Sequence, residues 1–229
     1  VSRRISVVKG FHRFCVAEDY TESNPAAGLP LPKTPERLPD VLSIDQVQRL
    51  FEALEGQEGG PAAVRNRAML EVLYGCGLRV SELCGLDRSD VVLDQGYLLV
   101  LGKGGKQRIS PISGAAATAL ADYLENARPQ LCKPYAKPTD AVFLNARGGR
   151  LTRQSVFKVV ARAGLAIGVD NLHPHTLRHS FATHMLQRGA DLRVIQHTLA
   201  QPAISNMQVY THVDRSHLRE EYLHAHPRA

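Results

Sequence analysis

Side chains able to do chemistry are densest between residues 173 and 189, which read HPHTLRHSFATHMLQRG. Leu177, Phe181 and Met185 recur every four residues, a spacing typical of the buried face of a helix. His175 and Arg178 are three residues apart and would share an adjacent flank of that helix. A proton carrier and a cation would then lie on one surface. Taken alone, the pair also fits a hydrogen-bonded cap and a solvated arginine.

A zinc site is another interpretation of this stretch. His175 and His179 have the i, i+4 spacing of two metal ligands on one helix. An HExxH motif would place Glu directly after the first histidine, where this sequence has Thr176, and no cysteine lies nearby. We therefore expect no metal.

Two further basic residues lie beside glycines. Arg79 follows Gly77 in GCGLRVSELCGL (residues 75–86), at the predicted start of a helix, where its guanidinium could face an oxyanion bidentately. Lys103 lies in LGKGGKQR (residues 101–108), whose glycines predict a hairpin tip. From such a tip an ammonium group can reach into a groove. Each residue alone also fits an ordinary solvated surface.

Tyr210 lies in the stretch TLAQPAISNMQVYTHVD (residues 198–214). Most tyrosines in globular proteins are half-buried packing residues with a solvated hydroxyl, so Tyr210 taken alone fits packing as well as chemistry. A tyrosine phenolate can form a covalent intermediate, but the hydroxyl, with an ordinary pKa of about 10, needs help to lose its proton. Arginines such as Arg79 and Arg178 could neutralise negative charge that develops during such a reaction.

The composition suits a protein that binds a polyanion. The chain has 229 residues, with 28 Lys and Arg against 22 Asp and Glu and a formal net charge of +6. This moderate excess favours a nucleic-acid partner without requiring one. The four cysteines form no CxxC pair, which favours reduced thiols. No apolar run approaches the roughly 20 residues that cross a bilayer, and no signal peptide is evident, so we expect a cytoplasmic protein without a membrane partner.

The elements that must position these residues are mainly helical. A Ser43–Gln46 capping box predicts one helix start, and five prolines between residues 25 and 39 predict a linker. Short segments rich in apolar residues predict strands over 97–101, 106–112 and 141–145, the first two forming a hairpin through a glycine-rich turn. We therefore expect a mainly α fold with a small antiparallel three-stranded sheet (α+β). The predicted helices cover about 1–20, 43–54, 62–74, 115–126, 152–167, 174–189, 191–199 and the residues from 214 onward.

Five motifs, taken together and in this order, resemble the tyrosine recombinases, the lambda-integrase-like DNA strand-exchange enzymes, and most closely their Xer branch. They are GLRVSEL, GKGGKQR, LRHSFATHMLQRGADLRVIQ, VYTHV and the terminal HPRA. The resemblance implies that residues 41–229 form the catalytic domain and residues 25–40 an interdomain linker. It implies that residues 1–24 are the last helix of a helical, SAM-like core-binding domain, with further sequence upstream.

The resemblance also implies a role for each site residue, without metal or cofactor. Tyr210 would attack the phosphorus, Lys103 would protonate the leaving 5′ oxygen, and His175 would manage the proton of the tyrosine hydroxyl. The product would be a 3′-phosphotyrosine and a free 5′-hydroxyl. Arg79 and Arg178 would hold the phosphate, and the residues expected to bind DNA are Lys106, Arg108 and Arg153.

One position departs from the family pattern. Nine residues before the tyrosine the family usually has Leu-Gly-His, whose histidine binds the scissile phosphate, whereas this chain has Leu199, Ala200 and Gln201 followed by Pro202. The Gln201 amide can still donate a hydrogen bond, but it carries no positive charge and shuttles no proton. Activity could therefore persist or be weakened.

The implied function is site-specific recombination, in a Xer-type system that resolves chromosome dimers at cell division. The implied partners are a double-stranded DNA recombination site, a sister Xer-type recombinase with further protomers in a tetramer, and an FtsK-type translocase. The alternatives are a phage, integron or transposon integrase, and a catalytically weakened DNA-binding module. A helix-turn-helix regulator would leave Arg79 and Lys103 unexplained. The last helix could dock on a neighbouring protomer or pack on its own core.

Overall fold

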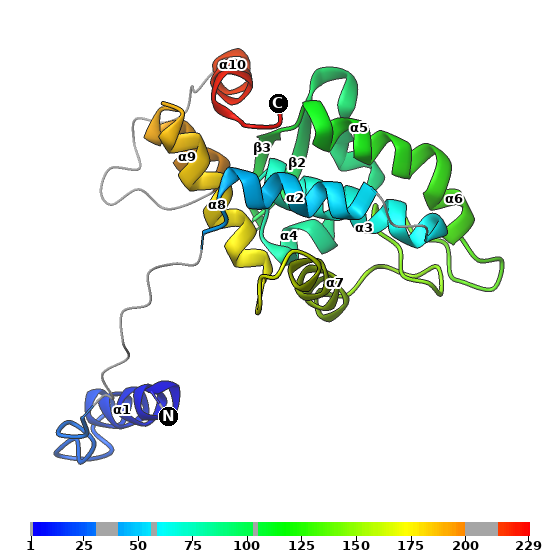
Figure 1. The fold of residues 1–229 in the computed structure, drawn as a ribbon. Helices are drawn as coiled ribbons and strands as arrows, with labels where there is room; N and C mark the ends of the chain where they lie inside the picture. Colours follow the sequence, from blue (N-terminus) through cyan, green and yellow to red (C-terminus); the bar gives the residue numbers. More distant parts are fainter. Residues whose placement is uncertain (1, 31–40, 56–58, 103–104, 200–214) are drawn as a thin grey trace. The chain divides into compact units, whose positions relative to one another are not determined.

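The structure of the chain is a computed structural model that describes residues 2–30, 41–55, 59–102, 105–199 and 215–229 (Figure 1). It divides into two compact units, Val1–Leu38 and Pro39–Ala229. Lys103, Gln201 and Tyr210 lie outside the described residues. Most of the predicted linker, residues 31–40, does so too.

The first unit contains helix α1 (Ser2–Ala17) and the turns that follow it. Val7, Phe11 and Phe14 on this helix are 64%, 61% and 55% exposed. The Lys9 ammonium donates to the Ala27 carbonyl at 3.1 Å, which closes the following turns back onto the helix. The predicted helix over residues 1–20 is therefore present, and its place in a core-binding domain stays a prediction.

The second unit is mainly helical, as predicted. Ser43 and Gln46 form both hydrogen bonds of the capping box, at 2.8 and 3.1 Å, so α2 starts where the sequence indicates. Its helices are α2 (Ile44–Glu55), α3 (Gly60–Gly75), α4 (Val80–Gly85), α5 (Gly114–Asp122), α6 (Arg128–Leu131), α7 (Arg153–Ala166), α8 (Pro174–Gln187), α9 (Leu192–Leu199) and α10 (Arg215–Ala225), with one π-helical turn (Tyr123–Ala127) between α5 and α6.

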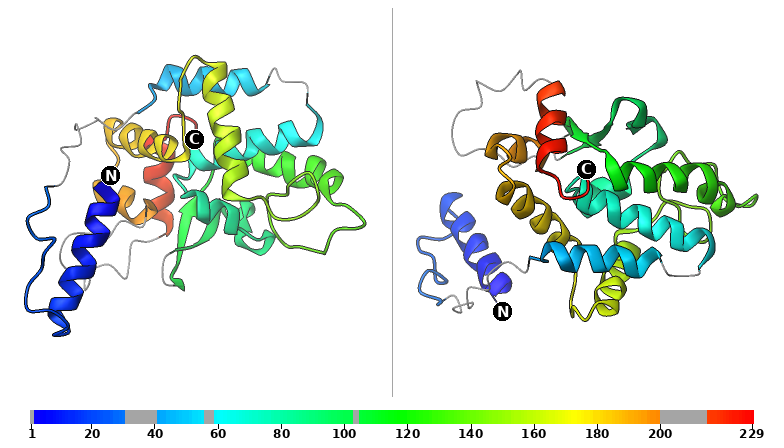
Figure 2. Two further views of the ribbon diagram at one scale, coloured as in Figure 1. Left: turned by 90° about the horizontal axis from the view of Figure 1, so that it is seen from below. Right: turned by 45° about the horizontal axis from the view of Figure 1, so that its top comes forward.

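Helix α3 is the central helix of this unit, and its C-terminal half, from Ala68 to Gly75, is buried. It packs against α2, α5 and α8, and α7 lies against α2 and α4 (Figures 1 and 2). The predicted buried face of α8 is confirmed, because Leu177, Phe181 and Met185 are at most 2% exposed. The core thus fixes the two helices that carry the candidate arginines.

The sheet has three antiparallel strands in the order β1 (Val91–Val92), β2 (Tyr97–Leu101) and β3 (Gln107–Pro111). The predicted hairpin is confirmed, with Val100 paired to Arg108 and Leu101 to Gln107. The predicted strand over 141–145 is wrong: Ala141 and Leu144 form only isolated bridges, with Asp87 and Arg150. The short segment 91–92 takes the third place in the sheet.

Helix α10 packs on its own unit rather than standing free, which is the second of the two predicted alternatives. Leu218, Tyr222 and Ala225 are at most 2% exposed. After α10 the chain returns to the core, where the Ala115 amide donates to the Arg228 carbonyl at 3.2 Å. The C-terminus therefore closes against the start of α5.

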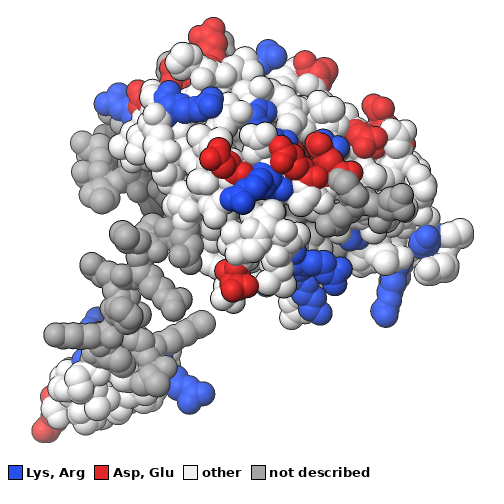
Figure 3. Space-filling model, viewed as in Figure 1, with Lys and Arg blue, Asp and Glu red and all other residues white. Residues whose placement is uncertain are grey.

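The visible surface of the second unit mixes charges of both signs. In the view of Figure 3, acidic and basic groups alternate over the face that α2 crosses, so this face is not a continuous cationic surface. None of the described helices is both long enough and apolar enough to cross a membrane.

Candidate active site

Arg79 occupies the position that caps the N-terminus of α4. The bend before it depends on Gly77, which has φ +58°, a conformation that side chains with a Cβ rarely adopt. A Cβ at Gly77 would lie 2.5 Å from Phe181 Cδ1 and 2.9 Å from Leu199 Cδ2. The glycine therefore allows α3, α8 and α9 to meet directly behind Arg79.

Glu82, one turn into α4, accepts hydrogen bonds from several arginines. The Arg79 amide donates to Oε2 at 2.8 Å and the Arg79 guanidinium to Oε1 at 2.9 Å. Arg108 donates to both oxygens at 2.9 Å, and Arg178 Nη1 lies 3.9 Å from Oε2. Three cationic side chains from α4, β3 and α8 thus converge on one carboxylate.

The carboxylate at the centre of this cluster is ionised. Its side chain is only 3% exposed. Burial alone would raise the pKa of Glu82, but the hydrogen bonds from Arg108 and Arg79 outweigh burial and hold that pKa below its ordinary value. One negative charge therefore faces three positive ones, so this cluster carries a net positive charge.

Arg178 is buried on α8 and is held by main-chain oxygens. Its guanidinium donates to the carbonyls of Gly77 and Leu199, joining the bend before α4 to the last residue of α9. Burial, followed by repulsion from Arg79, lowers the pKa of Arg178 to about 10, so the group stays protonated at neutral pH. A guanidinium has five N–H donors, so two such bonds leave capacity for an oxyanion.

His175 lies in the first turn of α8 and is solvent-accessible. Partial burial, then the charges of His173, His179 and Arg178, lower the pKa of His175 below its ordinary value. The neutral ring, which can accept a proton, is therefore the main form at neutral pH. The cap of α8 is supplied by His173, whose Nδ1 accepts from the Thr176 amide at 3.2 Å.

The residues expected to bind DNA fall into two groups. Lys106, beside the hairpin tip, and Arg153, the first residue of α7, are exposed. Arg108 points inward instead, with its side chain 8% exposed and its nitrogens bound by Glu82 and by the Thr198 carbonyl at 2.8 Å. The structure thus places Arg108 within the arginine cluster and away from the surface.

The hairpin that carries Lys103 is closed on both described sides of its tip. The Gly102 amide donates to the Lys106 carbonyl at 2.8 Å, and the β2–β3 ladder continues directly below.

No group of three or more metal-ligating side chains occurs among the described residues. His184, the most buried histidine of α8, bonds instead to the Tyr74 hydroxyl and the Leu42 carbonyl, each at 2.9 Å.

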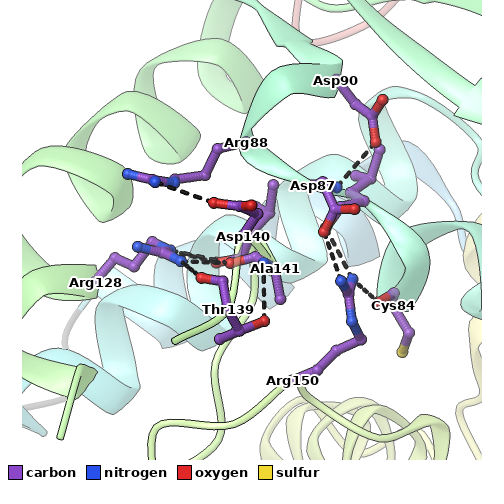
Figure 4. A network of polar contacts seen from close by, with 11 residues as sticks. Cys84, Asp87, Arg88, Asp90, Arg128, Thr139, Asp140, Ala141 and Arg150 are labelled. Atoms are coloured by element: carbon purple, nitrogen blue, oxygen red, sulfur yellow. Dashed lines mark hydrogen bonds and ion pairs between the residues drawn. The ribbon is translucent and has the colours of Figure 1, made fainter. Parts of the chain in front are cut away.

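A second polar network fixes the far end of α4 (Figure 4). Arg150 donates to the carbonyls of Cys84 and Leu86, at 3.0 and 3.1 Å, and to the Asp87 carboxylate at 2.5 Å. A cation at a helix C-terminus also interacts favourably with the helix dipole. Helix α4 is therefore anchored at both ends, by Gly77 and Glu82 at its start and by Arg150 at its end.

The sequence patterns did not identify Glu82 as part of the site. The available signal was its position three residues after Arg79, because an acidic residue there commonly bonds the main chain at a helix N-terminus. The inward orientation of Arg108 had a weaker signal, since strand alternation alone leaves open which face is covered.

Known proteins share both the sequence and the fold of this chain. Residues 40–217 match the model of the "Phage integrase family". The protein "Tyrosine recombinase XerD" of Halalkalibacterium halodurans is 43% identical over 230 aligned residues, covering 100% of this chain and 76% of that protein.

Solved structures of recombinases share the fold, and two of them illustrate the likeness. The crystal structure of XerA recombinase is 32% identical with a TM-score of 0.64, and the match covers 99% of this chain and 76% of that one. A pre-cleavage complex of XerH site-specific recombinase with its difH substrate is 29% identical with a TM-score of 0.64, and the match covers 82% of this chain and 55% of that one.

Proposed function

The chain belongs to the phage integrase family of tyrosine recombinases, and on that premise we propose that its arginine cluster holds a DNA phosphodiester while Tyr210 attacks it. The observation that carries the proposal is the convergence of Arg79 and Arg178 beside Glu82, with His175 one turn before Arg178 on the same helix.

Binding and charge neutralisation are the tasks of the two arginines. In the transition state negative charge builds up on the non-bridging phosphate oxygens, and fixed donors aimed at those oxygens lower the barrier. Glu82 restricts the motion of Arg79, and two carbonyls restrict that of Arg178, so both guanidinium groups are oriented before substrate binds. Loss of one such donor typically costs about a hundredfold to a thousandfold in rate.

Three side chains account for the covalent step and its protons. The Tyr210 oxygen forms a bond to phosphorus while the bond from phosphorus to the 5′ oxygen breaks. We assign the tyrosine proton to neutral His175 and the proton for the leaving 5′ oxygen to Lys103. The 3′-phosphotyrosine keeps the energy of the broken bond, so a free 5′-hydroxyl can later reverse the step on a partner strand.

The biological setting is a Xer-type system. The identity to proteins named Tyrosine recombinase XerD supports resolution of chromosome dimers in the cytoplasm, and the DNA complex of XerH recombinase supports a double-stranded recombination site as substrate. We further propose a sister recombinase, further protomers on the same DNA, and an FtsK-type translocase as partners. Lys106 and Arg153 would contact the DNA backbone.

Gln201 favours a second candidate, a recombinase-like module that binds DNA and cleaves slowly. An amide can donate a hydrogen bond to the phosphate, but it lacks the charge of a protonated histidine. The two candidates differ in the rate of covalent chemistry and not in the binding of DNA.

A nicked suicide duplex carrying the recognition site tests the proposal, because loss of the short 5′ fragment traps the covalent intermediate. We expect the wild-type protein to form an adduct with the DNA and Tyr210→Phe to form none. An adduct from Gln201→His but not from wild type would favour the weakened module. Absence of an adduct from both would reject catalysis by this site.

A further inference from the structure

We propose that Arg108 is a positioning residue for the recombination reaction, joining three elements of the active site. It connects the hairpin of Lys103, the start of α4 with Arg79, and the C-terminal end of α9. This inference rests on the proposed function and assigns Arg108 a task other than direct contact with DNA.

The first connection is to α4. Arg108 donates from Nη1 to Glu82 Oε1 and from Nη2 to Glu82 Oε2, both at 2.9 Å. The same carboxylate accepts from the Arg79 guanidinium at 2.9 Å. Arg108 therefore fixes the orientation of the carboxylate, and the carboxylate fixes that of Arg79.

The second connection is to α9. Arg108 Nε donates to the Thr198 carbonyl at 2.8 Å, one residue before the Leu199 carbonyl that Arg178 holds. Two arginines thus bind successive carbonyls at the end of α9, where the helix leaves such oxygens without partners. In the sequence, the segment that begins there carries Gln201 and Tyr210.

The third connection is to the hairpin. Arg108 is on β3, paired with Val100 on β2, and Gly102 and Lys106 close the tip between them at 2.8 Å. The hydrogen bonds of Arg108 to Glu82 of α4 and to the Thr198 carbonyl of α9 therefore fix the base of the hairpin relative to Arg79. In the sequence, Lys103 follows Gly102 directly.

Burial separates this task from DNA contact. The Arg108 side chain is 8% exposed and the Glu82 side chain 3%, whereas neighbouring Lys106 is exposed. The planar guanidinium satisfies both carboxylate oxygens and a carbonyl at once, which the single ammonium of a lysine cannot do in the same geometry.

The test compares Arg108→Met and Arg108→Lys with wild type in the suicide-duplex assay at saturating DNA, alongside a DNA-binding titration. Arg67→Met is the matched control, because Arg67 forms an exposed ion pair with Glu55 away from the cluster. We expect DNA affinity to stay within about threefold of wild type in all variants. Adduct formation should fall about 10- to 100-fold in Arg108→Met, the loss typical of a small displacement of reacting groups, and less in Arg108→Lys.

The pH dependence of adduct formation provides a readout that general loosening would not change. The charged groups that face Glu82 are Arg79 of α4, Arg108 of β3 and Arg178 of α8. Two histidines lie close to these arginines: His197 of α9 is near Arg108, and His175 is near Arg79. Loss of Arg108 removes the strongest of the hydrogen bonds that lower the pKa of Glu82, so that pKa rises in Arg108→Met. The deficit of Arg108→Met should therefore be larger at the acidic end of the assayed pH range than at the alkaline end. It should lose this pH dependence when Glu82→Gln is added.

The outcomes are distinct. An adduct from wild type with equal rates in Arg108→Met would overturn the inference and leave the proposed function intact. A deficit that higher DNA concentration removes would also overturn it, because Arg108 would then be a DNA contact. If Arg108→Met does not fold, Arg108→Lys is judged by the same criteria. No adduct from wild type would reject the proposed function itself.

Discussion

Arg228 near the C-terminus forms an ion pair with the buried Glu71 of α3. Its guanidinium contacts the two carboxylate oxygens at 2.5 and 3.2 Å and lies 4.4 Å from the centroid of the Phe51 ring. The Glu71 side chain is 1% exposed. The end of the chain is thus bonded to the central helix of the core.

Arg228→Met should destabilise the protein by about 2–4 kcal/mol, because it leaves the Glu71 carboxylate buried without its partner. Burial already raises the pKa of Glu71, and loss of Arg228 raises it further. The defect should therefore diminish at acidic pH, where Glu71 is neutral. Chemical denaturation at about pH 7 and about pH 4.5 measures this, and a loss of equal size at both pH values would contradict it. Arg88→Met, at the exposed Arg88–Asp140 ion pair, should cost less than about 1 kcal/mol.

His226 should make the protein less stable as the pH falls below about 6.5. Burial, together with the charge of Arg228, lowers the pKa of His226 to about 3 in the folded state. Below about pH 6.5 the unfolded chain therefore binds a proton at this histidine, whereas the folded chain does not. This difference lowers the free energy of unfolding by about 2 kcal/mol at about pH 5. His226→Phe keeps a ring stacked on Tyr222, whose centroid lies 4.8 Å away, but cannot titrate. Its stability should vary less between about pH 7 and about pH 5; an unchanged slope would show that other groups titrate there.

Gly77→Ala should impair both folding and catalysis. The residue has φ +58°, and the added Cβ would meet Phe181 and Leu199 side chains that are themselves buried. Strain and overpacking together should cost about 2–4 kcal/mol. Gly85→Ala, at the other end of α4, would meet nothing within 4 Å and should be near neutral. Thermal unfolding compares the two, and adduct formation should fall only in Gly77→Ala because Arg79 is displaced.

The sequence predicted elements whose signals are local. The capping box at Ser43 depends only on side chains three residues apart, and it formed as expected. The predicted strand over 141–145 failed because a short apolar run indicates burial without specifying hydrogen-bond partners. Val142 and Leu144 are fully buried, yet the Val142 carbonyl accepts from the Tyr123 hydroxyl and the Leu144 amide donates to it. The Val142 amide donates to the Leu86 carbonyl, so these groups form no continuous ladder with a neighbouring strand.

In the candidate site too, features with a local sequence signal were predicted and features that depend on long-range packing were not. Motif order placed Arg79, Arg178 and His175 in one site, and the structure brings the two arginines to one carboxylate. The contacts of Arg108 and Arg178 with Glu82 depend on how α4, β3 and α8 meet, which is a long-range property. A basic residue in a hairpin looks the same in sequence whether it faces DNA or a buried carboxylate. Lys103, Gln201 and Tyr210 lie outside the described residues, so their roles stay predictions.

His175 should set the acidic limit of adduct formation. As the proposed proton acceptor for Tyr210 it must be neutral, and its surroundings hold the pKa of His175 below the ordinary value. The rate should therefore stay level as the pH falls to about 6.5 and decline only at lower pH, where the ring becomes protonated. His175→Asn keeps a polar side chain that cannot accept the proton, so the rate should fall about a hundredfold or more. Single-turnover adduct formation between about pH 5 and about pH 8 measures both effects. A wild-type rate that halves near pH 7.5, or an acidic decline that persists in His175→Asn, would assign the proton to another group.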